Sequence, residues 1–347
     1  VGSLVKNSST ENIARLFGTV ATLSKEPTKS GLKKLTQMAK DDHPMIKSWQ
    51  KVFQNASPKA VEKAMTNLVV NEFALGEKIR QEKMLEHEVV IPKLLVLSPT
   101  YACNLNCVGC YAGLYGRKYQ LSKEEVSSII RQANELGIYF FIVTGGEPFV
   151  WPHLLEIFEE FNDSYFQVYT NGTLITKEVA KKLAELGNAT FAVSVEGFEG
   201  ETDWRRGRGV FEKIKTAWAN LKEAGVIYGT SVTATRLNHD VMMKDEFWQF
   251  LKDKGFLGML IAKEHGGLGF GAQAQSMIVS KIASRSVAAG ITVMVPNSLG
   301  PGELLEKYGT PEQKDKYLSR LARGLEVPCF ALTGVHSGSD AGGMRDI

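Results

Sequence analysis

Apolar residues recur at helical spacing in the first 90 residues of the chain. Two such sets would each line one face of a helix: Ile13, Leu16, Phe17, Val20 and Leu23, then Val61, Ala64, Met65, Leu68 and Val69. Ser57-Pro58 opens the second set as a cap residue followed by proline. Residues 1–90 therefore predict a helical segment. We expect its Lys and Glu residues to form a solvated face, and we assign it no chemistry.

Between residue 91 and about residue 236, short apolar runs alternate with amphipathic stretches. The runs predict strands at 94–98, 139–143, 166–169, 190–195 and 228–235. The stretches predict helices at 122–136, 152–161, 177–186 and 210–224, with Ser122 as the cap of the first. Repeated strand–helix units are typical of an α/β fold with parallel strands and right-handed crossovers. The pattern fits either a curved open barrel or a flat doubly wound sheet.

Past residue 240 the pattern becomes mostly helical. Residues 245–254 predict an amphipathic helix that Gly255 ends. This helix and the apolar run at 257–262 could instead supply the next helix and a sixth strand of the sheet, but we expect them to stay with the helices that follow. The chain thus divides into a helical segment at 1–90, an α/β region at 91–243 and a mostly helical region at 244–347.

Composition narrows the class of protein. The 347 residues are enough for about two domains. A net charge of +3 is too small to indicate binding to nucleic acid or to an anionic membrane. No apolar run reaches the roughly 18 residues that a membrane-spanning helix needs. Because the chain begins Val1-Gly2-Ser3, with no initiator methionine and no signal-peptide pattern, we expect a piece of a longer reading frame.

Three of the four cysteines lie within eight residues. Cys103, Cys107 and Cys110 follow a predicted buried strand, and loops at the carboxyl ends of strands are where α/β proteins bind ligands. Clustering of this kind argues against disulfides and for a reducing, cytoplasmic compartment. Three thiolates can hold three irons of a cubane and leave the fourth iron open. A zinc site is the alternative, but zinc takes four ligands, and Cys329 is 219 residues beyond Cys110.

The C-x3-C-x2-C spacing of these cysteines resembles the radical S-adenosylmethionine (SAM) family. The resemblance implies a partial (β/α) barrel, a [4Fe–4S] cluster held by Cys103, Cys107 and Cys110, and SAM bound to the open iron. It also implies that an outside donor such as flavodoxin or ferredoxin supplies one electron. SAM is then cleaved, and the 5′-deoxyadenosyl radical abstracts hydrogen from a small-molecule or peptide substrate. The residues identify neither that substrate nor a catalytic side chain.

Further candidates follow the next predicted strands. The resemblance implies that the segment Gly145, Gly146, Glu147 and Pro148 binds the amino group of SAM, with glycines that let backbone approach a ligand. Asn171, Ser194 and Glu196 are candidates for other SAM contacts, and Ser194 and Glu196 equally for substrate contacts. The plainer interpretations are a glycine turn, an Asn-Gly turn and polar residues at a wet strand end. Gly109 replaces the aromatic residue that often packs on adenine in the family.

Residues 245–345 resemble a second family, the N-terminal helical domain of acyl-CoA dehydrogenases. The resemblance rests on segments in matching order: Phe256–Phe270, Pro296–Glu303, Tyr308–Lys314, Phe330–Thr333 and Ser337–Asp340. It implies flavin or acyl-CoA contacts at Phe330, Leu332, Thr333 and Ser339. Gly334-Val335 replaces the usual Glu-Pro.

The second resemblance covers only part of a dehydrogenase. The β-domain and the helical bundle that complete the flavin site would follow this region, so we expect FAD only in a completed protein, and no dehydrogenase activity here. Two partial families that meet near residues 241–245 indicate a chimera, natural or from assembly. A flavin-dependent dehydrogenase fragment and a non-catalytic metal-cluster module remain alternatives to a radical SAM enzyme.

Overall fold

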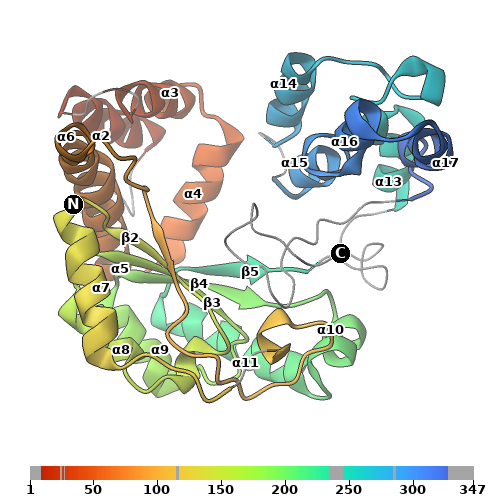
Figure 1. Ribbon diagram of the computed structural model, residues 1–347. Coiled ribbons are helices and arrows are strands. Elements are labelled where there is room, and N and C mark those ends of the chain that lie inside the picture. Colours follow the sequence, from red (N-terminus) through yellow and green to blue (C-terminus); the bar gives the residue numbers. More distant parts are fainter. Residues whose placement is uncertain are drawn as a thin grey trace. The chain divides into compact units, whose positions relative to one another are not determined.

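The computed structural model describes residues 9–23, 26, 28–114, 117–233, 245–283 and 287–326. The chain separates into two compact units, Val1–Asn238 and His239–Ile347 (Figure 1). Each unit has its own hydrophobic core and is described by itself.

A five-stranded parallel sheet organises the first unit. Its strands lie in the order of the sequence: β1 (Leu95–Leu97), β2 (Phe140–Val143), β3 (Tyr165–Thr170), β4 (Ala189–Ser194) and β5 (Tyr228–Ser231). Right-handed crossovers that always advance in one direction keep their helices on a single face of the sheet. A doubly wound sheet needs a reversal of strand order instead. The α/β prediction is therefore confirmed, and the described strands follow the order of a partial barrel.

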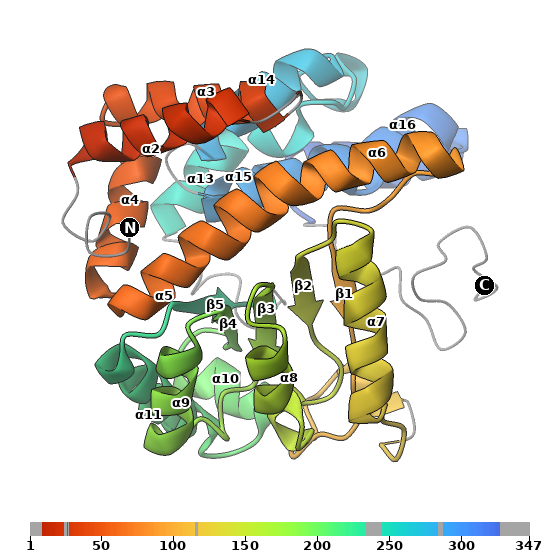
Figure 2. The ribbon, with the colours of Figure 1, turned by 90° about the vertical axis from the view of Figure 1, so that its left-hand side faces the viewer.

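Four helices cover that face (Figure 2): α7 (Lys123–Glu135), α8 (Leu154–Glu160), α9 (Lys177–Leu186) and α11 (Val210–Ala224). Ser122 caps the start of α7 as predicted, and Glu125 completes a capping box with it. Beneath the helices, Phe166 packs against Phe141 and Phe158 in the core, with ring centroids 5.7 and 4.7 Å apart. Along β4, buried residues alternate with half-buried ones that end in Ser194, so the other face of the sheet is the more open one.

Helices precede the sheet, as predicted: α2 (Thr10–Leu23), α3 (Thr28–Lys40), α4 (Pro44–Asn55), α5 (Pro58–Lys63), the π-helix η1 (Ala64–Gly76) and α6 (Glu77–His87). The continuous helix α5–α6 crosses the amino ends of the strands (Figure 2). There Asn67 Nδ2 donates to the Ser164 carbonyl at 2.8 Å, and the Tyr139 N–H donates to Glu72 Oε2 at 2.8 Å. This helix covers the amino ends of the strands. The loops that follow the strands lie at the opposite, carboxyl ends.

The expectation of a solvated face on this helix is wrong for Glu72 and Glu77, which are buried around Arg80. Arg80 is buried, with Nη1 2.7 Å from Glu72 Oε1 and Nη2 3.0 Å from Glu77 Oε2. Its Nη1 also donates to the Gly137 carbonyl at 2.5 Å. These charges tie the helix to the sheet, because a buried charge persists only where it is paired and hydrogen-bonded.

The second unit is helical: α13 (Asp245–Asp253), η4 (Phe256–Gly258), η5 (Lys263–His265), α14 (Ala272–Ala283), α15 (Val287–Met294), η6 (Val295–Leu299), α16 (Pro301–Tyr308) and α17 (Pro311–Ala322). Residues 257–262 form no strand and do not extend the sheet, as expected. Among the described residues, no helix has both the length and the apolar character needed to cross a membrane.

Candidate functional site

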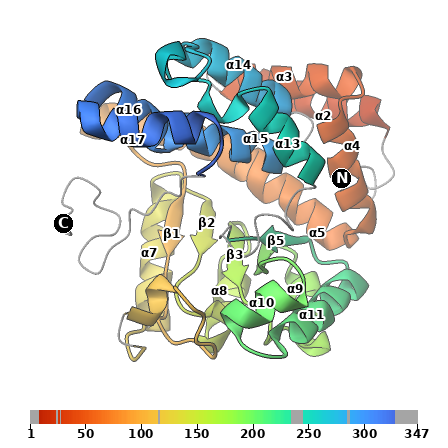
Figure 3. The same cartoon turned by 90° about the vertical axis from the view of Figure 1, so that its right-hand side faces the viewer.

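The three clustered cysteines lie on the loop that follows β1, at the edge of the sheet opposite α5–α6 (Figure 3). The Val108 N–H donates to the Arg205 carbonyl at 2.8 Å, which fixes this loop to α10 (Glu199–Arg206). All three cysteines are free and half-buried. Burial raises the pKa of the Cys103 and Cys107 thiols, and the nearby charge of Cys110 acts in the same direction on both.

The chemistry of the thiols suits an iron–sulfur cluster. Three soft sulfur donors on one loop are ligands of the kind that such clusters take from proteins. In the part of the chain that the structure describes, the one group of three ligand atoms within 4.8 Å of one another contains no cysteine. The donor set of the loop therefore fits the cluster that the sequence predicts.

Gly145 and Gly146 pack against the backbone of the cysteine loop. The Gly146 N–H donates to the Thr100 carbonyl and the Glu147 N–H to the Ala102 carbonyl, both at 2.8 Å. A Cβ would lie 2.4 Å from the Thr100 oxygen at Gly145 and 2.2 Å from the Ala102 oxygen at Gly146. From the sequence, we expected a ligand to approach these glycines closely. The group that approaches them is the cysteine loop itself.

The Glu147 carboxylate lies almost completely inside the protein, 1% exposed. Its Oε1 accepts from the Thr170 hydroxyl at 2.7 Å and the Phe149 N–H at 3.1 Å, and its Oε2 accepts from the Asn171 N–H at 2.7 Å. Burial raises its pKa in spite of these donors. A carboxylate has about four acceptor positions, so three are already used within the chain. The Glu147 carboxylate, which we expected to accept from a ligand, therefore mainly joins the ends of β2 and β3 through hydrogen bonds.

Replacing Glu147 with glutamine is expected to destabilise the first unit by about 1–3 kcal/mol. A glutamine NH2 must face an N–H that can only donate, either that of Asn171 or that of Phe149. Urea denaturation followed by tryptophan fluorescence measures the loss. The matched control is Glu124→Gln on the exposed first turn of α7, which should stay within about 0.5 kcal/mol of the parent. Equal stability of the two variants would contradict the assigned role of Glu147.

Glu196 follows β4 and is held by two arginines that the sequence analysis missed. Arg205 Nη1 lies 2.7 Å from Glu196 Oε1, and Arg206 Nε lies 2.6 Å from Oε2. Arg206 also places Nη1 4.0 Å from Cys107 Sγ. The expected open acceptor at Glu196 is thus engaged inside the chain. The sequence offered one signal for this pairing: two arginines lie nine and ten residues after Glu196. They end the helix α10, which contacts the cysteine loop.

The remaining candidates fall into three groups. Pro148 is buried at the start of the short helix η3 (Pro148–Val150), and Asn171 lies within hydrogen-bonding range of the cysteine loop. Ser194 ends β4, paired in register with Ser231, and is half-buried. The predicted flavin contacts lie outside the described residues: Phe330, Leu332, Thr333 and Ser339.

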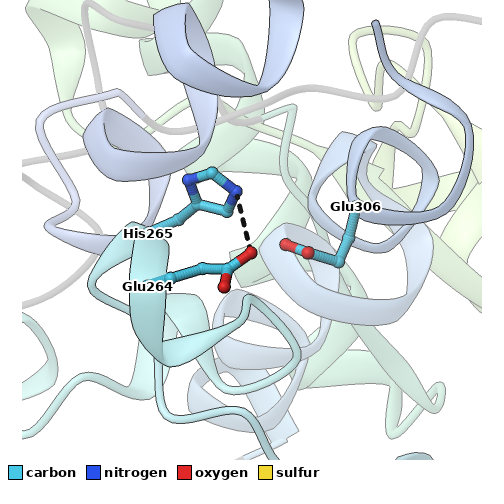
Figure 4. Close-up of side chains that lie close together, drawn as sticks. All are labelled: Glu264, His265 and Glu306. Carbon is cyan, nitrogen blue, oxygen red and sulfur yellow. Dashed lines mark ion pairs between the residues drawn. The ribbon is translucent and has the colours of Figure 1, made fainter. Parts of the chain in front are cut away.

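A second group of possible ligands lies in the second unit (Figure 4). Glu264, His265 and Glu306 bring one ligand atom each within 4.8 Å of the others. Glu264 is 79% exposed, and Glu306 Oε2 already accepts from the Ala262 N–H at 3.3 Å. Water solvates an exposed carboxylate without an ion, so we assign no metal to this group.

Comparison with known protein families agrees with the two resemblances, to radical SAM proteins and to acyl-CoA dehydrogenases. Residues 97–253 match the Radical SAM superfamily, and residues 230–325 match the Acyl-CoA dehydrogenase N-terminal domain. The chain is 30% identical over 159 residues to the AdoMet-dependent heme synthase of Methanosarcina barkeri, which covers 44% of this chain and 46% of that protein. It is 34% identical over 173 residues to the mycofactocin maturase MftC of Mycolicibacterium smegmatis, with coverages of 48% and 44%. It therefore spans less than half the length of these relatives.

The later part of the chain has different relatives. It is 37% identical over 111 residues to the acyl-CoA dehydrogenase of Bacillus subtilis, which covers 30% of this chain and 29% of that protein. Among solved structures, Streptococcus suis SuiB bound to S-adenosylmethionine is 20% identical, with a TM-score of 0.42 and coverages of 59% and 50%.

Proposed function

On the premise that residues 97–253 are a region of the radical SAM superfamily, we propose that this chain is a radical SAM enzyme. In the proposal, Cys103, Cys107 and Cys110 hold a [4Fe–4S] cluster. When bound, the cluster and SAM supply a 5′-deoxyadenosyl radical that abstracts hydrogen from a substrate. The observation that carries the proposal is the set of three free, half-buried thiols on one loop, locked to the β2 loop by two backbone hydrogen bonds.

The chain's own residues would order and shield this site. The glycines after β2 let the cysteine loop pack closely, and Glu147 fixes the end of β3 beside it. The Arg206 guanidinium lies beside Cys107 and offsets part of the thiolate charge. We propose SAM contacts at the backbone of Gly145, Gly146 and Glu147 and at the Ser194 hydroxyl, with Pro148, Asn171 and Glu196 ordering the surrounding loops.

A curated relative of this chain is named a maturase and another a heme synthase, so we propose a small-molecule or peptide substrate. Reduction would come from an outside donor such as flavodoxin or ferredoxin. A cytoplasmic location suits free thiols and an oxygen-sensitive cluster.

We propose that the later part of the chain is a domain like the N-terminal domain of acyl-CoA dehydrogenases and that it is inactive as a dehydrogenase by itself. The domain boundaries proposed are 1–90, 91–243 and 244–347, with a chimeric join near 241–245. FAD would bind only together with the β-domain and the helical bundle that complete a flavin site in that family. Purification tests this directly, because a yellow flavin chromophore on the isolated protein would contradict it.

Anaerobic reconstitution tests the proposed function. The purified chain is incubated with iron and sulfide, reduced with dithionite and given SAM. About four irons per chain and the release of 5′-deoxyadenosine are expected. Cys107→Ala should lose both, while Glu124→Gln should keep both. One zinc per chain, or a cluster whose spectrum SAM does not change and which forms no 5′-deoxyadenosine, would contradict the proposal.

A further inference from the structure

We propose that Asn171 is a positioning residue that holds the Cys103 sulfur and raises the reduction potential of the cluster. This inference rests on the proposed function, because it concerns the same thiols. It assigns Asn171 to the cysteine loop and not to SAM.

Both ends of the Asn171 side-chain amide are used within the chain. Its Oδ1 accepts from the Thr173 N–H at 2.9 Å and from the Thr173 hydroxyl at 2.7 Å. A backbone N–H can only donate, so this contact identifies the oxygen end of the amide. The Nδ2 end then donates to Asn104 Oδ1 at 2.9 Å and lies 4.0 Å from Cys103 Sγ. An asparagine amide has two N–H donors and two acceptor positions, and all four are directed to neighbours.

The position of this amide is held from several sides. Asn171 is 6% exposed, and its backbone N–H donates to Glu147 Oε2 at 2.7 Å. Asn104, the residue after Cys103, also donates from Nδ2 to the Thr173 hydroxyl at 2.8 Å. The loop after β3 therefore clamps the cysteine loop next to its first sulfur. The Leu105 N–H lies 3.4 Å from the same sulfur, so two N–H groups from different segments converge on Cys103.

These contacts have an electronic consequence. Reduction adds negative charge to a cluster and its sulfur ligands, and N–H groups directed at a sulfur stabilise that charge. Hydrogen bonds to the sulfurs are among the features that set the potential of iron–sulfur clusters. Because the amide is already fixed, no side-chain ordering is needed when the cluster is reduced. Asn171 thus makes reduction by an outside donor easier.

Potentiometric titration of the reconstituted protein, followed by electron paramagnetic resonance, tests this inference. Asn171→Asp keeps an oxygen for the Thr173 N–H but removes both N–H donors, and Asn171→Leu removes every polar contact at similar size. Each should make reduction of the cluster about tenfold less favourable, which is a shift of 59 mV to lower potential for one electron. The control is Thr173→Val, which removes two hydroxyl contacts and leaves the N–H directed at Cys103. Its potential should match that of the parent.

A second measurement uses the protein without its cluster, in case a variant does not assemble one. Alkylation of Cys103 by iodoacetamide, compared with Cys107 by mass spectrometry, should be at least threefold slower in both Asn171 variants, because the thiolate loses an N–H that stabilises it, and unchanged in Thr173→Val. Parent-like potentials and alkylation in the Asn171 variants, or equal shifts in Thr173→Val, would overturn the inference. Failure of the parent to take up iron and sulfide would instead overturn the proposed function.

Discussion

Replacing Gly146 with alanine is expected to abolish assembly of the cluster, with at least a tenfold loss of bound iron and of SAM cleavage. The added Cβ would lie 2.2 Å from the Ala102 carbonyl oxygen and 2.6 Å from that of Tyr101. Both neighbours are backbone, so no side chain can turn away to relieve the contact. The cysteine loop must shift as a whole, which separates Cys103 from the ends of β2 and β3. Iron content after anaerobic reconstitution measures the effect.

The chain offers a matched control in the same loop. Gly113 has nothing within 4 Å of the position that a Cβ would take. Gly113→Ala should therefore bind as much iron as the parent. Thermal unfolding of both variants separates a local shift of the loop from general unfolding, because overpacking typically costs about 1–3 kcal/mol. A Gly146→Ala protein with the parent's iron content would show that the two loops do not need this close approach.

Arg80→Met is expected to reduce the free energy of unfolding of the first unit by about 3–5 kcal/mol, because it leaves the buried Glu72 carboxylate without its cationic partner. Burial already raises the pKa of Glu72 above its ordinary value of 4.5, and removing Arg80 raises that pKa further. A carboxyl with a raised pKa in the folded protein stabilises the fold while it is protonated, and this contribution is lost as the pH rises. The deficit of the variant should therefore grow as the pH rises above 4.5.

Urea denaturation at several pH values measures this deficit. Arg15→Met is the control, because the Arg15–Glu11 pair on α2 has both side chains more than 70% exposed. Exposed pairs of this spacing contribute about 0.3–0.5 kcal/mol. If the two variants lost similar free energy, the buried charges would not tie the α5–α6 helix to the sheet.

Local signals explain why much of the fold was predictable. The ends of α9 and α11 were predicted correctly because local cap residues mark them. Thr176 caps the start of α9, and Gly187 and Gly225 directly follow the last residues of the two helices. The strands were less exact, since β5 was predicted to reach residue 235 and its described part ends at Ser231. Strand ends depend on pairing with a neighbour, and that neighbour is distant in the sequence.

The partners of three candidate site residues share one physical cause. Glu147, Asn171 and Glu196 were expected to offer polar groups to a ligand, and each also has partners in the chain that the sequence did not predict. Two of these three residues are partners of each other, 24 residues apart, and Asn104 lies 67 residues before Asn171. These residues meet because neighbouring parallel strands end in register at one edge. A pattern read along the chain cannot supply those contacts. The same holds for Arg80, which resembles a solvated helical residue until Gly137 and Glu72 enclose it.

The amino-acid sequence alone determined the alternation of strands and helices, the three-cysteine loop and the two family resemblances, because each depends on residues close together along the chain. The tertiary structure decided that the helices cover one face of the sheet and that the cysteine loop packs on Gly145 and Gly146. It also decided which residues pair with the buried carboxylates. Those features depend on which distant segments share an edge, and buried charges and backbone groups are satisfied only once that packing is set.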